Sequence, residues 1–244
     1  MSHPLLPKNV TRIEKEATFR FSCHPSVVCF TDCCRQLELA LTPYDVLRLK
    51  KGCGLRSEEF LDRYVIIEQE EHGTFPRFYL TMIDDGRASC VFVSDAGCTL
   101  YQDRPGACRA YPLGRAAIRQ ADNTMEEFFV LLQESHCQGF QELQEQNGAT
   151  YCTEQGMAIY NHFNDAVAAI LQHEQIRQGK RLSENQIEQF ILALYNLDQF
   201  RTLLFTGQLA GTTEVDDTIR QRLVDEEELL LYAIDWLKNI LFKK

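Results

Sequence analysis

Residues 23–34 read CHPSVVCFTDCC, and this stretch carries four of the ten cysteines in a chain of 244 residues. Further cysteines follow at positions 90, 98, 108 and 137. Thiolates are soft ligands that suit zinc and iron–sulfur clusters. In a reducing compartment a cluster of thiols is typical of a metal site or a catalytic site rather than of a disulfide framework. The stretch therefore predicts a metal centre.

The compartment is inferred from what the sequence does not carry. Residues 1–8 contain no continuous apolar run and no small-residue cleavage site of the kind found in secretory signals. The apolar stretches are far shorter than the roughly 18 residues that indicate a membrane span. We therefore expect a cytoplasmic protein without a membrane span, in which the thiols stay reduced. Disulfides are the alternative interpretation of the cysteines.

Composition narrows the classes of function. The hydrophobic content of 45% is sufficient for a globular core. The net charge of −10 disfavours general nucleic-acid binding, which needs a basic surface. Two arginines, Arg104 and Arg109, flank Cys108. We expect them to offset the charge of a thiolate centre and to donate hydrogen bonds to sulfur; bidentate binding of an anionic ligand is the alternative.

Two patterns divide the chain. Between residues 18 and 140 the expected elements are short, with a helix that Thr42 caps and strands near 77–82, 88–93, 113–119 and 127–133. From about residue 150 the apolar spacing becomes helical, with Thr153 and Ser183 as expected helix caps and a third helix over 217–242. We expect an α+β protein: a small, Cys-rich, metal-binding α/β module at 1–148, followed by a C-terminal helical bundle at 149–244 packed on it.

The spacing of the cysteines constrains the number of metals. Structural zinc sites are usually tetrahedral, with ligand pairs two to four residues apart, and Cys29 and Cys33 fit this range. Cys33 and Cys34 are joined by one planar peptide, so they face different metals or bridge two if both are ligands. Two four-coordinate sites, or one site with several bystander thiols, both fit. The candidate metal ligands are Cys23, Cys29, Cys33, Cys34, Cys90, Cys98, Cys108 and Cys137.

Several motifs together carry a family resemblance. They are FSC at 21–23, CFTDCC at 29–34, LTPYD at 41–45, CVF at 90–92, GCTLY at 97–101 and RPGACRAYP at 104–112. These motifs resemble the YkgJ-like cysteine-cluster family over roughly residues 19–115, although the spacing here is longer than that family's C-x2-C-x2-C-C. The resemblance implies chelated zinc or iron, with an iron–sulfur cluster among the alternatives.

The resemblance leaves the biological role open. One hypothesis is a metal-binding protein whose centre is structural or serves metal or redox handling. The alternative is a metal-dependent enzyme, such as a protein lysine methyltransferase, because the family includes flagellin lysine methylases. The chain has no Gly-rich dinucleotide fingerprint and no P-loop. The expected partners are a metal ion and, through the helical region, another protein.

Overall fold

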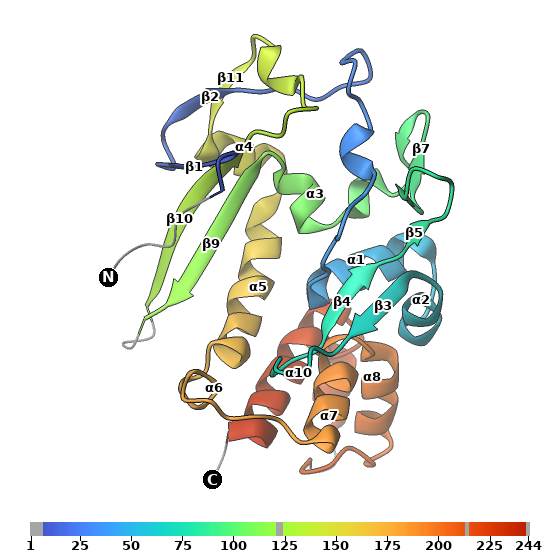
Figure 1. Cartoon of the computed structure of the whole chain (residues 1–244). Helices are drawn as coiled ribbons and strands as arrows, with labels where there is room; N and C mark the ends of the chain where they lie inside the picture. The colour runs from blue at the N-terminus through green and yellow to red at the C-terminus, as the bar shows by residue number, and fades with distance from the viewer. Residues whose placement is uncertain (1–6, 121–123, 213–214, 243–244) are drawn as a thin grey trace. The chain divides into compact units, whose positions relative to one another are not determined.

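The protein is described by a computed structural model, which covers residues 7–120, 124–212 and 215–242. It contains both strands and helices, which confirms the α+β class (Figure 1). The chain divides into two compact units. The first comprises Met1–Glu38 and Met82–Asn161, and the second comprises Leu39–Thr81 and His162–Lys244.

The largest sheet of the first unit has three antiparallel strands in the order β1-β10-β9. Their bounds are Val10–Ile13 (β1), Met125–Leu132 (β10) and Leu113–Arg119 (β9). Leu131 lies opposite Leu113 in the register. The sheet buries Leu113, Phe129 and Leu131 in a cluster with Phe19, Phe21 and Tyr151. The strand pair expected near 113–119 and 127–133 is therefore present.

The other elements of the first unit are very short. The paired strands are β2 (Thr18–Arg20) with β11 (Glu145–Asn147), β5 (Met82–Ile83) with β6 (Ser89–Cys90), and β7 (Val93–Ser94) with β8 (Gly97–Cys98). The helical turns are η1 (Asp32–Cys34), η2 (Tyr101–Asp103), α3 (Gly106–Ala110), η3 (Gly139–Gln141) and α4 (Gly148–Glu154). Because an isolated two-stranded hairpin is only marginally stable in water, these cysteine-bearing segments depend on further contacts.

The second unit combines a middle segment of the chain with the C-terminal helices. The middle segment supplies α1 (Pro43–Cys53), α2 (Ser57–Tyr64), β3 (Val65–Glu68) and β4 (Arg77–Leu80). The later helices are α5 (Met157–Leu171), α6 (Glu174–Arg177), α7 (Glu184–Leu194), α8 (Leu197–Phe205), α9 (Asp217–Arg222) and α10 (Glu226–Phe242). Thr42 and Asp45 form the capping box of α1, with the Thr42 N–H 2.8 Å from the Asp45 carboxylate.

This division differs from the expected boundary between 1–148 and 149–244. The segment Leu39–Thr81 packs with the C-terminal helices because its aromatic side chains are buried against theirs. Tyr44 stacks on Phe163 with ring centroids 4.4 Å apart, and Phe78 stacks on Tyr195 at 3.4 Å. The chain passes from the first unit to the second for the last time between Asn161 and His162, which lies within α5.

The expected N-cap at Thr153 is wrong. Asn147 caps α4 through its side chain, which accepts a hydrogen bond from the Thr150 N–H at 2.9 Å. The Thr153 hydroxyl donates instead to the Ala149 carbonyl, one turn back in the same helix. Gly156, with a φ of 64°, separates α4 from α5. The expected cap at Ser183 is present at the start of α7.

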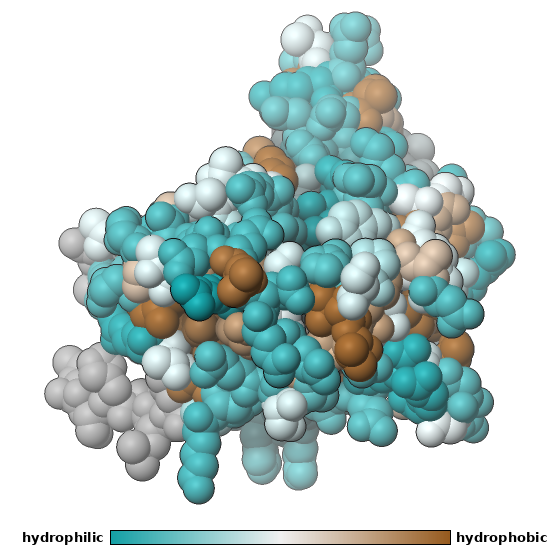
Figure 2. Space-filling model, turned by 90° about the horizontal axis from the view of Figure 1, so that it is seen from above, coloured by the Kyte–Doolittle hydropathy of each residue, from teal (hydrophilic) through white to brown (hydrophobic). Residues whose placement is uncertain are grey.

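One face of the molecule is largely hydrophilic. Figure 2 shows hydrophobic side chains on one face as separate patches within a largely hydrophilic surface. Within the described ranges, no helix has both the length and the apolar content needed to cross a membrane.

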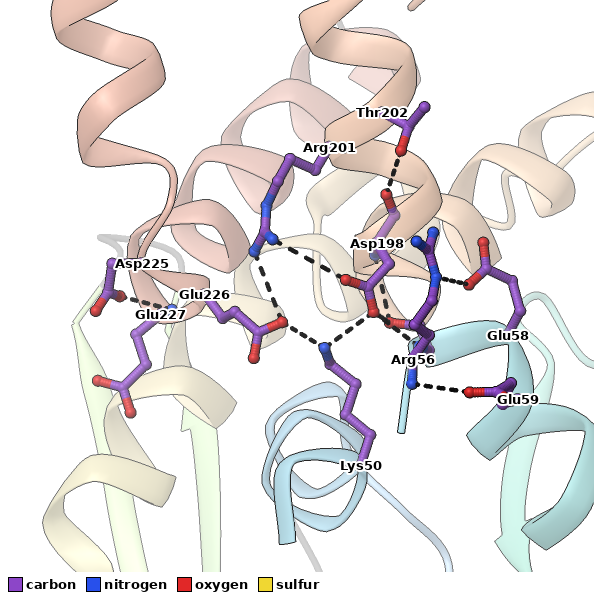
Figure 3. A network of polar contacts seen from close by, with 11 residues as sticks. Lys50, Arg56, Glu58, Glu59, Asp198, Arg201, Thr202, Asp225, Glu226 and Glu227 are labelled. Atoms are coloured by element: carbon purple, nitrogen blue, oxygen red, sulfur yellow. Dashed lines mark hydrogen bonds and ion pairs between the residues drawn. The ribbon is translucent and has the colours of Figure 1, made fainter. Parts of the chain in front are cut away.

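A buried network of charges joins four helices of the second unit (Figure 3). The Lys50 ammonium of α1 lies 3.0 Å from Asp198 of α8 and also contacts Glu226 of α10. Asp198 accepts hydrogen bonds from the Ser57 N–H at 2.7 Å and from its hydroxyl at 2.9 Å, at the start of α2. Arg201 lies 3.6 Å from Glu226. The network therefore fixes the packing of α1, α2, α8 and α10.

We expect Lys50→Met to destabilise the protein by about 3–5 kcal/mol, because it leaves two partly buried carboxylates without their main cation. Urea unfolding followed by helix circular dichroism measures the effect. Lys51→Met is the matched control, since Lys51 is exposed on the same helix, and it should change stability by less than about 0.5 kcal/mol. Equal effects of the two substitutions would contradict a structural role for the network.

The network also predicts a pH dependence with a definite sign. Burial acts to raise the pKa of Asp198, but hydrogen bonds from Ser57 and Lys50 hold it below its ordinary value of 3.8. The stabilisation is therefore present above that value and is lost as the pH falls through the lower, folded-state pKa. The difference in unfolding free energy between the native chain and Asp198→Asn should shrink in acid. A difference that stays constant down to the acid limit would refute this assignment.

Candidate metal centre

Four cysteines from two distant stretches of the first unit line one pocket. Its lining includes the thiols of Cys23, Cys29, Cys33 and Cys137, together with Tyr111 and His136. We call this site the thiol pocket. The first three cysteines precede or belong to η1, and Cys137 lies just before η3. The pocket thus contains half of the predicted metal ligands.

Close backbone packing holds the two stretches together. The Ser22 N–H donates to the Gly139 carbonyl at 3.1 Å, and the Phe21 N–H donates to the Gln144 carbonyl at 3.1 Å. A Cβ on Gly139 would lie 2.6 Å from the Phe21 ring and 2.8 Å from the Ser22 carbonyl oxygen, so only glycine fits. The Gln138 N–H donates to the Cys29 sulfur at 3.1 Å. Cys137 is therefore carried into the pocket by a segment that contacts the first cysteine stretch directly.

The thiols of the pocket affect one another. Burial, assisted by Cys33, Cys29 and Cys137, raises the pKa of the Cys23 thiol to about 11. A hydrogen bond with Cys34 and burial raise the pKa of Cys33. Burial also raises the pKa of Cys137. Without a cation these groups hold their protons, and a metal that binds here as a thiolate complex must release them.

Tyr111 adds a polar group to the wall of the pocket. Its hydroxyl oxygen is buried and has no hydrogen-bond partner among the described atoms. Burial, followed by the nearby Cys137 thiol, raises the pKa of Tyr111. The ring is fixed by an edge contact with Phe21, and the Tyr111 carbonyl accepts a hydrogen bond from Tyr151. The phenol is thus held close to the Cys137 thiol.

The other predicted ligands do not line the thiol pocket. Cys34 is the last residue of η1, Cys90 lies on β6 and Cys98 lies on β8. Cys108 is exposed on α3. The Cys98 thiol contributes to the raised pKa of Cys90, so these two thiols lie within electrostatic reach of each other.

Two cysteines were not expected to be ligands. Cys53 ends α1 in the second unit, and Cys152 lies on α4 beside the apolar cluster of the first unit. All ten cysteines fall within the described residues, and none of them forms a disulfide.

The arginines beside Cys108 donate hydrogen bonds to main-chain carbonyls and to the Gln155 side chain. Arg109 donates to the carbonyls of Arg104 at 3.2 Å and Gln155 at 3.0 Å, and it also contacts the Gln102 carbonyl. The buried Arg104 donates to the Tyr101 carbonyl at 2.5 Å and to the Gln155 side chain at 2.6 Å. The expected hydrogen bonds from these arginines to sulfur are not among these contacts. Burial raises the pKa of the Cys98 thiol, and the Arg104 cation opposes this rise.

The four cysteines of the thiol pocket are suitable ligands for a thiophilic metal. Their sulfur atoms do not surround a common point at which a metal could bind. Within residues 7–120, 124–212 and 215–242, no group of three or more His, Cys, Asp or Glu side chains is disposed to hold a metal ion. Coordination would therefore require the thiols to move together, which is usual where metal binding is coupled to folding.

Comparison with known proteins agrees with this chemistry. Residues 22–138 match the model of the CxxCxxCC family, described as "Putative zinc- or iron-chelating domain". Searches of curated proteins and of solved structures found no match. The matched span begins one residue before Cys23 and ends one residue after Cys137, so it contains all eight predicted ligands. Residues 22–138 of the chain are therefore similar to the CxxCxxCC family.

Proposed function

We propose that the protein chelates zinc or iron at the thiol pocket through Cys23, Cys29, Cys33 and Cys137. One observation carries the proposal: two stretches far apart in sequence, joined by a hydrogen bond between residues 109 positions apart, bring four thiols to one pocket. Four thiolates are the ligand set of tetrahedral structural zinc and of common iron–sulfur clusters. The family description supports the same two metals.

The complete set of protein donors favours a structural role or a role in metal or redox handling. A catalytic metal keeps an open coordination position, whereas a site with four protein thiolates does not. The alternative of a metal-dependent lysine methyltransferase gains no support from this donor set. Because thiolates must stay reduced to bind metal, a reducing compartment such as the cytoplasm suits the proposal. Binding of a protein partner through the helical region stays a prediction.

Removing two donors of the thiol pocket should reduce metal retention. We expect anaerobically purified chain with Cys23→Ser and Cys137→Ser to lose zinc or iron that the native chain retains, measured by elemental analysis. A visible absorption band in the native protein would identify an iron–sulfur cluster, and its absence together with stoichiometric zinc would identify a zinc site. Cys53→Ser is the control, because Cys53 lies in the second unit. Unchanged metal content in the double variant would refute the proposal.

The Tyr111 hydroxyl should stabilise the bound metal. Once Cys137 is a thiolate, the neighbouring phenol can donate a hydrogen bond to its sulfur, and loss of such outer-shell partners typically weakens metal binding about 10- to 100-fold. We therefore expect faster metal transfer to a chelator from Tyr111→Phe, which keeps the ring. Tyr101→Phe is the control, since that side chain is exposed. Equal rates of metal transfer from the two variants would contradict this prediction and show that Tyr111 contributes only through the packing of its ring.

A further inference from the structure

An open hollow lies at the turn of the β5–β6 hairpin, within the first unit and outside the thiol pocket. Its volume of about 400 Å³ is in the range of about 300–1,000 Å³ that is usual for small-molecule sites. Side chains of the segment Met82–Ala88 line it together with Gln36, and no cysteine contributes to the lining. We call it the hairpin hollow, and its chemistry is separate from that of the thiols.

Strained backbone surrounds the hairpin hollow. Gln36 and Ala88, which both line it, have φ angles of 54° and 48°, in the left-handed region that residues other than glycine rarely adopt. Among the described residues, Thr31 is the one other non-glycine residue with a positive φ, and its carbonyl accepts a hydrogen bond from Arg35, the neighbour of Gln36. Such strain persists only where surrounding contacts enforce it, and it is concentrated at ligand sites. The backbone therefore identifies this hollow as a candidate binding site.

Hydrogen bonds fix the strained segments to each other. The Gln36 N–H donates to the Ala88 carbonyl at 2.9 Å, which joins the two sides of the hollow. Within the hairpin turn, the Asp85 carboxylate accepts hydrogen bonds from the N–H groups of Arg87 at 2.9 Å and Ser89 at 3.3 Å. The main chain around the hollow is thus formed without a ligand, and a preformed site has less conformational freedom to lose on binding.

The lining combines two opposite charges with aliphatic surface. Asp84 is exposed, and within the part of the chain that the structure describes no hydrogen bond or ion pair engages its carboxylate. The Arg87 side chain is 60% exposed and lies 3.7 Å from Asp32, an exposed pair of the kind that contributes little and is readily exchanged. Met82 and Ile83 add aliphatic surface, and Ile83 is 46% exposed. A simple anion would be repelled by Asp84, and a simple cation would leave Arg87 unused.

We propose that the hairpin hollow binds a free α-amino acid with an aliphatic side chain. The Arg87 guanidinium binds the α-carboxylate, for which its planar pair of N–H donors is suited. The Asp84 carboxylate accepts hydrogen bonds from the α-ammonium, and the ligand's side chain packs on Met82 and Ile83. This binding site is additional to the proposed metal centre and does not depend on it.

Titration of the full-length protein with L-leucine, followed by two-dimensional amide NMR at neutral pH, tests the proposal. We expect saturable shifts at Gln36 and within the segment Met82–Ala88, with a dissociation constant in the millimolar range or below. Two analogues separate the charges, since L-leucinamide lacks the carboxylate and 4-methylpentanoate lacks the ammonium. Each should bind at least about 10-fold more weakly, the factor that corresponds to the loss of one modest ionic contact.

Variants assign the two charges to their residues. Arg87→Gln and Asp84→Asn should each weaken L-leucine binding by about 10-fold or more. Asp95→Asn is the matched control, because Asp95 is an exposed carboxylate on the β7–β8 turn of the same unit and does not line the hollow, so its affinity should equal that of the native chain.

Three results would overturn the proposal: no saturable shift with L-leucine, shifts confined to other segments, or equal binding of L-leucine and either analogue. The analogue series uses the native chain alone, so a variant that fails to fold does not leave the proposal untested. None of these results alters the metal content, so failure here is distinct from failure of the proposed metal centre.

Discussion

The close approach of Gly139 to the Phe21–Ser22 backbone is the constraint on which the candidate centre depends. It brings the segment of Cys137 alongside the first cysteine stretch, where the Gln138 N–H reaches the Cys29 sulfur. Without it the thiol pocket would lose its fourth donor and one of its hydrogen bonds to sulfur. A side chain at position 139 would clash with backbone as well as with an aromatic ring, so neighbouring side chains cannot simply move aside.

The two units differ in how they obtain stability. The second unit buries large aromatic side chains such as Tyr44, Phe78 and Phe200 and adds the charged network of Lys50. The first unit buries a small apolar cluster around Phe21, and its cysteines lie on loops, on two-residue strands or on short helical segments. Such elements bury little surface, so their order depends on cross-links between them. A metal bound by thiolates supplies this cross-link, because its binding free energy is also folding free energy.

Local signals in the sequence were sufficient for some elements and insufficient for others. Thr42 with Asp45 three residues later identifies the start of α1, because a capping box depends only on neighbouring residues. The assignment of Leu39–Thr81 to the second unit depends on the stacking of Tyr44 on Phe163, which no local pattern reveals. Thr153 failed as a cap because Asn147 lies at the true helix start. The planar Cys33–Cys34 peptide left open whether these two thiols face different metals or bridge two, and the structure places Cys33, but not Cys34, in the lining of the thiol pocket.

The arginines show why residue type and spacing do not define a role. Both were expected to aim at sulfur, yet Arg109 is occupied by main-chain carbonyls and Arg104 by Tyr101 and Gln155. Arg104 still acts on the thiols through its charge, which needs proximity rather than a hydrogen bond. Because a guanidinium keeps its proton in proteins, a buried Arg104 provides a permanent cation beside Cys98 and Cys108. In a chain with a net charge of −10, this cation opposes the build-up of further negative charge at these thiols.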